Sequence, residues 1–223
     1  MTTETRRVLL TGFEAFGGLD YNPSWDVAQE VARRARLQEL TTQQEHSGVV
    51  VSTACLPVEF DRAGDVLKAA IADQQPDMVI SLGLAAGTDA LRLERVGLNL
   101  RDARIPDNAG NQPDDAPVVP GADTALFSTL RLKAAQRRIA EAGFPVQLST
   151  SAGTYVCNDV LYTLLHHLIA TEQQIPAGFL HVPDLHAHSA PLTVSEAATA
   201  VDLLMAESFV TAEDEARPAG SLH

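Results

Sequence analysis

The chain has 223 residues and a formal net charge of −13, from 16 basic and 29 acidic residues. A surface that acidic repels phosphate backbones, so we expect no nucleic-acid partner. Hydrophobic residues make up 45% of the chain and aromatic residues only 5%. This length and composition are typical of an α/β protein that buries a full core within one domain.

The chain contains two cysteines, Cys55 and Cys157. Two are too few for a disulfide framework in a chain of this length. The apolar run after Arg7 is shorter than the hydrophobic region of a signal peptide, and no stretch approaches the ~20 apolar residues of a membrane span. We therefore expect a cytoplasmic protein with free thiols and no membrane partner. Cys55 stands in an apolar run, so we expect it to be buried.

The N-terminal part alternates aliphatic runs with helical patterns. Three runs are typical of strands: 7–11, 48–56 and 78–82. The last is continuously apolar, as in a strand that is buried on both faces. Asn22-Pro23-Ser24 is typical of a helix start, and Asp61 is expected to cap a second helix that ends before Pro76.

The C-terminal part continues the alternation. Residues 91–98 alternate charged and aliphatic side chains and predict a less buried strand, which a long polar loop over 101–121 follows. Helices are predicted at 123–143, 158–170 and 194–210, and strands at 146–150 and 178–182. Residues 212–223 have no apolar period, so we expect a mobile tail after a single domain over 1–211.

This alternation favours a three-layer α/β/α sandwich, in which a mainly parallel, twisted sheet has helices on both faces. In such sheets ligands bind outside the carboxyl ends of the strands. Cys157, His181 and the glycine-rich segment 12–18 all fall at predicted strand ends. We therefore expect one site at that edge of the sheet.

Cys157 has two possible roles. Lone cysteines are often small buried hydrophobic residues. However, Cys157 stands at a predicted strand-to-helix junction, where helix N-terminal amides and the helix dipole favour an anion such as a thiolate. The same amides could hold an oxyanion. The residue types alone do not decide whether Cys157 is a buried structural residue or a catalytic one.

The roles of His181 and Glu94 are open in the same way. His181 could be a core histidine, but its place at a strand end also suits the base of a thiol nucleophile. Glu94 is flanked by Arg92 and Arg95, so it could form a surface ion pair of little energetic value. If it is buried beside the imidazole instead, it would orient the base.

Other motifs give weaker signals. Segment 12–18 lacks the Lys-Ser/Thr pair of a phosphate loop, so its Phe13 and Phe16 could instead form an apolar slot. The histidines within 186–188 have no cysteine or acidic partners at metal-ligand spacing, and we predict no metal site. Arg104 in the polar loop could be solvated, or it could reach the site and stabilise negative charge.

Taken together, several runs resemble the motifs of the pyroglutamyl-peptidase I family of cysteine peptidases. They occur in family order and cover most of the chain: residues 10–18 with 22–24, 94–99, 102–108, 152–158 and 180–183. The resemblance implies that Cys157 is the nucleophile, His181 the base and Glu94 the orienting carboxylate. It also implies that Arg104 lies near an oxyanion that the Cys157 amide binds.

The resemblance further implies a pocket for a pyrrolidone ring. Phe13 and Phe16 would line it, and backbone groups near Tyr155 and Val156 or in the 12–18 loop would bind the lactam. A mostly apolar slot suits this neutral ring, whereas a charged amine would lose its hydration there. The family often has Gly-Gln-Ala and then Gly-Gly-Arg after its third strand, but residues 83–88 here read Gly-Leu-Ala-Ala-Gly-Thr. This departure removes polar groups near the pocket, and so bears on substrate affinity and loop packing.

The implied activity is removal of an N-terminal pyroglutamate from peptides through a thioester, without metal or cofactor, in a homo-oligomer (tetramer or dimer). Two alternatives stay open. One is an amidase of the same fold that acts on another small lactam or acyl amide, which Leu84 and Thr88 would permit. The other is a non-catalytic protein that binds pyroglutamyl peptides. Turnover of a pyroglutamyl-anilide reporter separates these functions.

Overall fold

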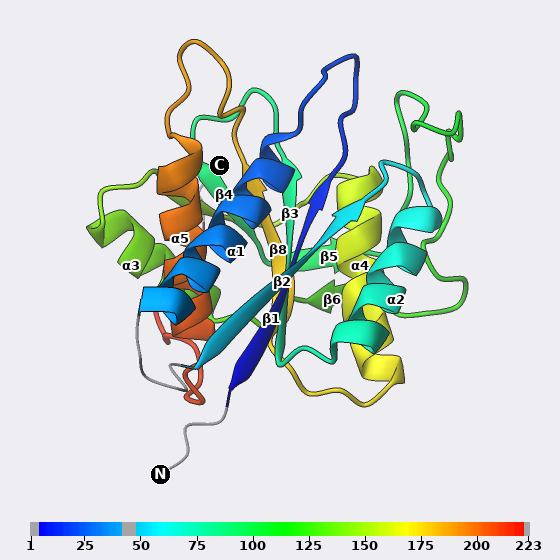
Figure 1. Cartoon of the computed structure of the whole chain (residues 1–223). Coiled ribbons are helices and arrows are strands. Elements are labelled where there is room, and N and C mark those ends of the chain that lie inside the picture. The colour runs from blue at the N-terminus through cyan, green and yellow to red at the C-terminus, as the bar shows by residue number, and fades with distance from the viewer. Residues whose placement is uncertain (1–4, 42–47, 221–223) are drawn as a thin grey trace.

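A six-stranded sheet runs through the centre of the protein (Figure 1). The computed structural model describes residues 5–41 and 48–220. The strands lie in the order β2 (Val49–Leu56), β1 (Arg6–Phe13), β3 (Met78–Leu84), β8 (Ala177–Val182), β4 (Leu91–Glu94) and β7 (Val146–Ser149). Neighbouring strands are parallel except for β4 and β8, which are antiparallel. The predicted fold class, with a mainly parallel sheet between helices, is confirmed.

Helices cover both faces of this sheet (Figure 1). One face carries α1 (Pro23–Thr41), α3 (Leu132–Glu141) and α5 (Val194–Ser208), and the other carries α2 (Arg62–Gln74) and α4 (Val156–Ala170). Pro23 is the first residue of α1, where its missing N–H costs nothing, and the Asn22 side chain accepts from the Ser24 amide at 3.2 Å. Within the described ranges, no helix is long and apolar enough to cross a membrane.

The alternation of side chains in β8 and β4 decides which face holds the polar residues. Aliphatic residues of both strands pack under α1, α3 and α5: Leu180, Val182, Leu91 and Leu93. The residues between them face α4 instead: Phe179 and His181 in β8, and Arg92 and Glu94 in β4. The strand period therefore gathers the chemical groups on the α4 face.

The predicted single strand over 91–98 is wrong. The chain leaves the main sheet at Arg95, so that β4 is followed by a separate strand, β5 (Val96–Leu98). The strand β4 is also more buried than we predicted, with Leu91, Leu93 and Glu94 fully inaccessible. The reason is its position between β8 and β7, where neighbouring strands flank it on both sides.

The predicted helix over 123–143 is wrong in its first part. Residues Ala125–Phe127 form β6, which pairs antiparallel with β5 in a small second sheet, and α3 begins only at Leu132. Pairing with a strand far away in sequence overrides the local helical pattern. The end of the helix agrees with prediction, since Gly143 follows α3 with a positive φ of 88°.

The polar loop over 101–121 is ordered by its own side chains. Asp107 accepts hydrogen bonds from the Phe60 amide at 2.8 Å and the Asn111 amide at 2.7 Å. Arg101 bridges Asp159 of α4, at 2.6 Å, and Asp61, at 2.7 Å. Asp61 stands at the start of α2 as predicted, but its side chain does not cap the helix because it pairs with Arg101.

The described part of the C-terminal tail lies against α3. The Asp214 carboxylate accepts from the amides of Lys133 at 2.9 Å and Ala134 at 3.0 Å. Arg217 donates to the Lys133 carbonyl at 2.9 Å. These bonds satisfy amides in the first turn of α3, whose own N-cap residue, Arg131, makes no side-chain cap. The predicted mobility of residues 212–223 stays a prediction.

Candidate active site

Cys157, His181 and Glu94 meet on the α4 face of the sheet. His181 Nδ1 lies 2.8 Å from Glu94 Oε1, and the imidazole also interacts with the Cys157 side chain. Glu94 is completely buried and His181 is nearly so. The structure therefore places Glu94 beside the imidazole, where the sequence had left a surface ion pair as the alternative.

The register of β4 and β8 explains why Glu94 reaches His181. Arg92 is the direct cross-strand partner of His181. Glu94 lies two residues further on, hence on the same face and diagonal to the imidazole, within reach of a long side chain. The antiparallel β4–β8 pair thus joins carboxylate and imidazole.

The sulfur of Cys157 lies over the end of β3, next to β8. Gly83 of β3 is the register partner of His181. A Cβ on Gly83 would stand 2.9 Å from Cys157 Sγ and 2.7 Å from Cζ of Phe179. Because real Cβ contacts are not that short, the missing side chain of Gly83 leaves the space that the thiol occupies.

The surroundings of His181 favour its charged form. Burial opposes a positive charge on the imidazole, but Cys157 and Glu94 outweigh that effect through charge and hydrogen bonds and raise the pKa of His181 to about 9. The imidazole is therefore protonated near neutral pH. An imidazolium between a carboxylate and a sulfur stabilises a thiolate, the reactive form of cysteine.

Cys157 also stands in the first turn of α4. The helix begins at Val156, two residues earlier than predicted. Backbone amides in the first turn of a helix have no partner within the helix, and the helix dipole is positive at that end. The Cys157 amide is one of these groups, and its predicted role as a donor to an oxyanion stays a prediction.

An aromatic cluster lies beside this helix start. The Tyr155 ring centre is 5.4 Å from that of Phe16 and 5.3 Å from that of Phe60. Burial, with Asp107 and Cys157 nearby, raises the pKa of Tyr155 to about 12. The phenol therefore stays protonated and donates to the Pro106 carbonyl at 2.9 Å.

The other predicted pocket residues differ in accessibility. Phe13 is buried, with its ring 6.5 Å from that of Phe179, and its amide already donates to Ser24 Oγ at 3.0 Å. Val156 is buried in the same core cluster. Of the two predicted phenylalanines, only Phe16 is partly open to solvent.

Two further predicted positions lie in loops. The Arg104 side chain is exposed, and no hydrogen bond or ion pair in the described residues joins it to Cys157. Thr88 donates to the Ala85 carbonyl at 2.8 Å, and the Ala85 amide donates to Val182 at 2.9 Å. The segment that departs from the family pattern is therefore bonded to the residue after His181.

The prediction that Cys55 is buried is wrong, because its side chain is exposed. It lies near the end of β2, the outermost strand of the sheet, where no further strand shields it. Partial desolvation of the thiol, and then the Glu14 carboxylate, raise the pKa of Cys55. An apolar run does not reveal whether its strand is at the edge, and this explains the error.

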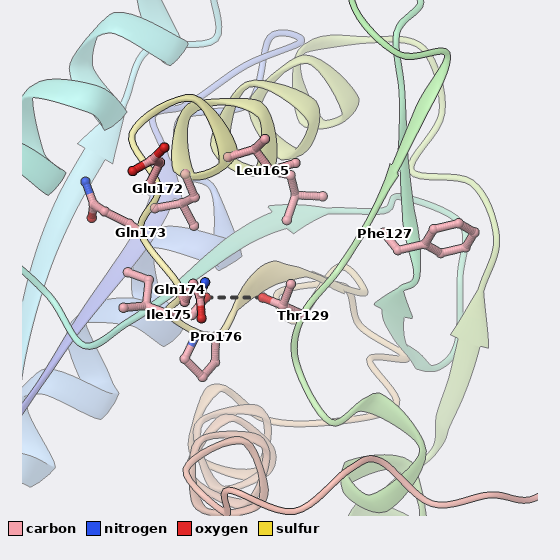
Figure 2. A pocket seen from close by; sticks show the side chains of 10 residues that line it. Phe127, Thr129, Leu165, Glu172, Gln173, Gln174, Ile175 and Pro176 are labelled. Atoms are coloured by element: carbon pink, nitrogen blue, oxygen red, sulfur yellow. Dashed lines mark hydrogen bonds between the residues drawn. The ribbon is translucent and has the colours of Figure 1, made fainter.

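A separate hollow lies away from these residues. Figure 2 shows it between the end of α4, the residues after β6 and the segment that precedes β8; Thr129 Oγ1 donates to the Ile175 carbonyl at 3.3 Å. Pro176 precedes β8, whereas His181 stands near the other end of that strand, so the hollow is at the opposite edge of the sheet. In the described ranges, no group of three His, Cys, Asp or Glu residues is arranged to hold a metal ion.

Known proteins show the same sequence pattern and fold. The sequence matches the pyroglutamyl peptidase family over residues 6–212. It is 39% identical to pyrrolidone-carboxylate peptidase 2 of Photorhabdus laumondii over 229 aligned positions, which cover 100% of both chains. It is 48% identical to the pyrrolidone-carboxylate peptidase of Streptomyces coelicolor over 178 positions, or 79% of this chain and 77% of that protein.

Solved structures agree with this assignment. The crystal structure of pyroglutamyl peptidase I from Bacillus amyloliquefaciens superposes with a TM-score of 0.86 at 32% identity, covering 96% of this chain and 100% of that one. Sequence and fold therefore agree over nearly the whole chain. The chain belongs to the pyroglutamyl peptidase family of cysteine peptidases.

Proposed function

We propose that Cys157, His181 and Glu94 carry out the reaction of this pyroglutamyl peptidase, the removal of an N-terminal pyroglutamate from a peptide. One observation carries the proposal: a fully buried carboxylate holds His181 at 2.8 Å while the same imidazole interacts with a cysteine at a helix start. Nucleophile, base and orienter are the three parts of an acyl-transfer site.

The thiolate of Cys157 attacks the carbonyl carbon of the pyroglutamyl residue. As the carbon–sulfur bond forms, the carbonyl electrons move onto oxygen, which the Cys157 amide at the α4 N-terminus stabilises. We assign Arg104 as a second donor to this oxygen. The support is local: Asp102, two residues before it, exchanges hydrogen bonds with Thr154, just ahead of α4.

His181 then gives its proton to the leaving amine as the carbon–nitrogen bond breaks, which leaves a thioester on Cys157. Water next attacks the thioester while His181 takes up a proton. The carbon–sulfur bond then breaks, pyroglutamate leaves, and the Cys157 thiolate is restored beside the protonated imidazole. Glu94 keeps the imidazole in place and supports its positive charge through both steps.

Specificity comes from the aromatic cluster beside Cys157. We propose that Phe16 and Tyr155 contact the pyrrolidone ring, that Phe13 supports them from the core, and that backbone near Val156 binds the lactam. A neutral ring loses little hydration there, whereas the ammonium of an ordinary N-terminus would lose much. Free-amine peptides are therefore poor substrates.

The test is turnover of a pyroglutamyl anilide, with a glutaminyl anilide and other acyl anilides as controls. We expect release from the pyroglutamyl compound, and none after Cys157→Ala or His181→Ala. Release only from other acyl groups would favour an amidase with a pocket altered at Leu84 and Thr88. Binding without release would favour a non-catalytic pyroglutamyl-peptide-binding protein.

We also propose that the chain acts in the cytoplasm as a homo-oligomer, a tetramer or a dimer. The support for assembly is the hollow of Figure 2, beside which Phe127 is 68% and Ile169 is 63% exposed. Large exposed apolar side chains around a hollow are typical of interaction surfaces. Light scattering should show a mass above that of one chain, and Phe127→Asp should reduce it.

A further inference from the structure

Two buried polar atoms without a hydrogen-bond partner belong to residues on one face of β4, in the candidate active site. In the described residues, four buried side-chain nitrogen or oxygen atoms have no hydrogen-bond partner, and Arg92 Nε and Glu94 Oε2 are two of them. Most buried polar groups in proteins are hydrogen-bonded, so such exceptions require an explanation. Two of them on neighbouring side chains, both on the His181 face of β4, indicate a shared role.

The contacts of Arg92 join two parts of the site. Its Nε lies 3.6 Å from Glu94 Oε1, the same oxygen that His181 Nδ1 contacts at 2.8 Å. Its terminal nitrogen donates to Ser149 Oγ at 2.7 Å and to the Ser151 carbonyl at 3.3 Å. Ser149 and Ser151 belong to the end of β7 and the turn that leads to Cys157. The guanidinium thus connects the carboxylate with the segment that carries the nucleophile.

We propose that Arg92 is a positioning residue, which fixes the Glu94 carboxylate and limits the basicity of His181 so that the imidazolium can release its proton. This inference rests on the proposed roles of Cys157, His181 and Glu94. The contact between Arg92 and Glu94 is not a surface ion pair, because Glu94 is completely buried and its carboxylate is already bonded to His181.

The charges around His181 oppose one another. Cys157 from α4 and Glu94 from β4 favour the imidazolium. We expect the positive charge of Arg92, 3.6 Å from Glu94 Oε1, to disfavour it; β3 and β7 contribute Gly83 and Ser149, which are uncharged. An imidazolium that is too stable is a poor acid for the leaving amine. Because the Arg92 side chain is 30% exposed, solvent screens its charge, and we expect a moderate effect.

Arg95 offers a matched control. It carries the same charge and adjoins Glu94 in sequence, but it lines a hollow with residues 127–133 and 212–214, near the tail. Removing its charge therefore tests the effect of any nearby cation, without touching the contacts of the carboxylate.

The experiment compares Arg92→Met, Arg92→Lys and Arg95→Met. For Arg92→Met we expect kcat to fall about 5- to 20-fold with KM within about 2-fold, and the alkaline limb of the kcat/KM profile to move up by about 0.5 to 1 pH unit. The loss of kcat should be larger for a pyroglutamyl peptide than for an anilide, because its leaving amine is more basic. Arg92→Lys should recover part of the rate, and Arg95→Met should match the parent.

Several outcomes would overturn the proposal. One is an unchanged pH profile in Arg92→Met; another is a rise in KM alone, which would mean that Arg92 binds substrate. If Arg92→Met does not fold, Ser149→Ala removes the 2.7 Å anchor and should shift the profile in the same direction by less. If Cys157→Ala retains turnover, the proposed triad itself fails, so the two failures are distinguishable.

Discussion

Cys55 and Cys157 stand at the same edge of the sheet in different surroundings. Cys55 is the more exposed of the two, but its neighbour Glu14 and partial desolvation raise its pKa and oppose a thiolate. Cys157 is less exposed, yet it stands at a helix start beside a protonated imidazole. The two thiols thus differ in nearby charge and in helix position, and we expect these to matter more for thiol reactivity than access to solvent does.

The strongest way to break this comparison is to remove each sulfur in turn. Cys157→Ala should lower kcat/KM by about 10⁴-fold or more, because no other group can form the thioester. Cys55→Ala should leave turnover of a pyroglutamyl anilide unchanged. Comparable losses in both variants would mean that the two thiols share the chemistry.

Glu94→Gln removes the carboxylate that supports the protonated imidazole beside Cys157, a neighbour that Cys55 lacks. The amide can keep a hydrogen bond to His181 but not the negative charge, so we expect kcat to fall by about 10²-fold. The active form of His181 is protonated and is lost as pH rises through its pKa of about 9. Without the carboxylate that pKa falls, so the alkaline limb should move to lower pH. A rate profile identical to that of the parent would contradict a role for Glu94.

Alkylation rates compare the reactivity of the two thiols directly. Near neutral pH, iodoacetamide should modify Cys157 about 10- to 100-fold faster than Cys55, and activity should be lost in step with Cys157. Mass spectrometry of each labelled peptide gives both rates. The rate at Cys55 should climb as pH rises towards its raised pKa. Faster labelling of Cys55 at neutral pH would show that exposure to solvent determines thiol reactivity in this protein.

Phe16→Ala should have a smaller effect. Phe16 contributes apolar surface next to Tyr155, and at ~25 cal/mol per Å² the loss of several tens of Å² costs about 1–2 kcal/mol, or roughly tenfold in kcat/KM. Phe144→Ala, which removes a half-buried ring on the other face of the sheet, is the control for loss of an aromatic side chain. Equal kcat/KM for Phe16→Ala and the parent would place the ring pocket elsewhere.

The sequence was informative where a residue carries its own chemical signature. Cys157 and His181 became candidates because a thiol and an imidazole each fell near the end of a predicted strand, and the family resemblance added Glu94 as the orienting carboxylate. The alternation of strands and helices likewise predicted the layered fold. These features depend on local pattern, which a single sequence contains.

The errors depend on contacts between distant residues. The exposure of Cys55 follows from the place of β2 at the sheet edge, and the strand β6 exists because Ala125–Phe127 pairs with β5. Sequence reasoning also gave Arg92 no part in the site. Its two-residue spacing from Glu94 could have placed both on one strand face, but the antiparallel β4–β8 register was needed to bring His181 there.

Asp214 has a practical consequence for shortening the chain. Its carboxylate performs, from more than seventy residues away, the task that a residue at the start of α3 would normally perform. We expect deletion of everything after residue 211 to destabilise the protein by about 1 kcal/mol through loss of this cap, whereas deletion after Arg217 should cost little. Thermal unfolding of the two shortened chains measures the difference. An affinity tag is therefore better added beyond the tail than in place of it.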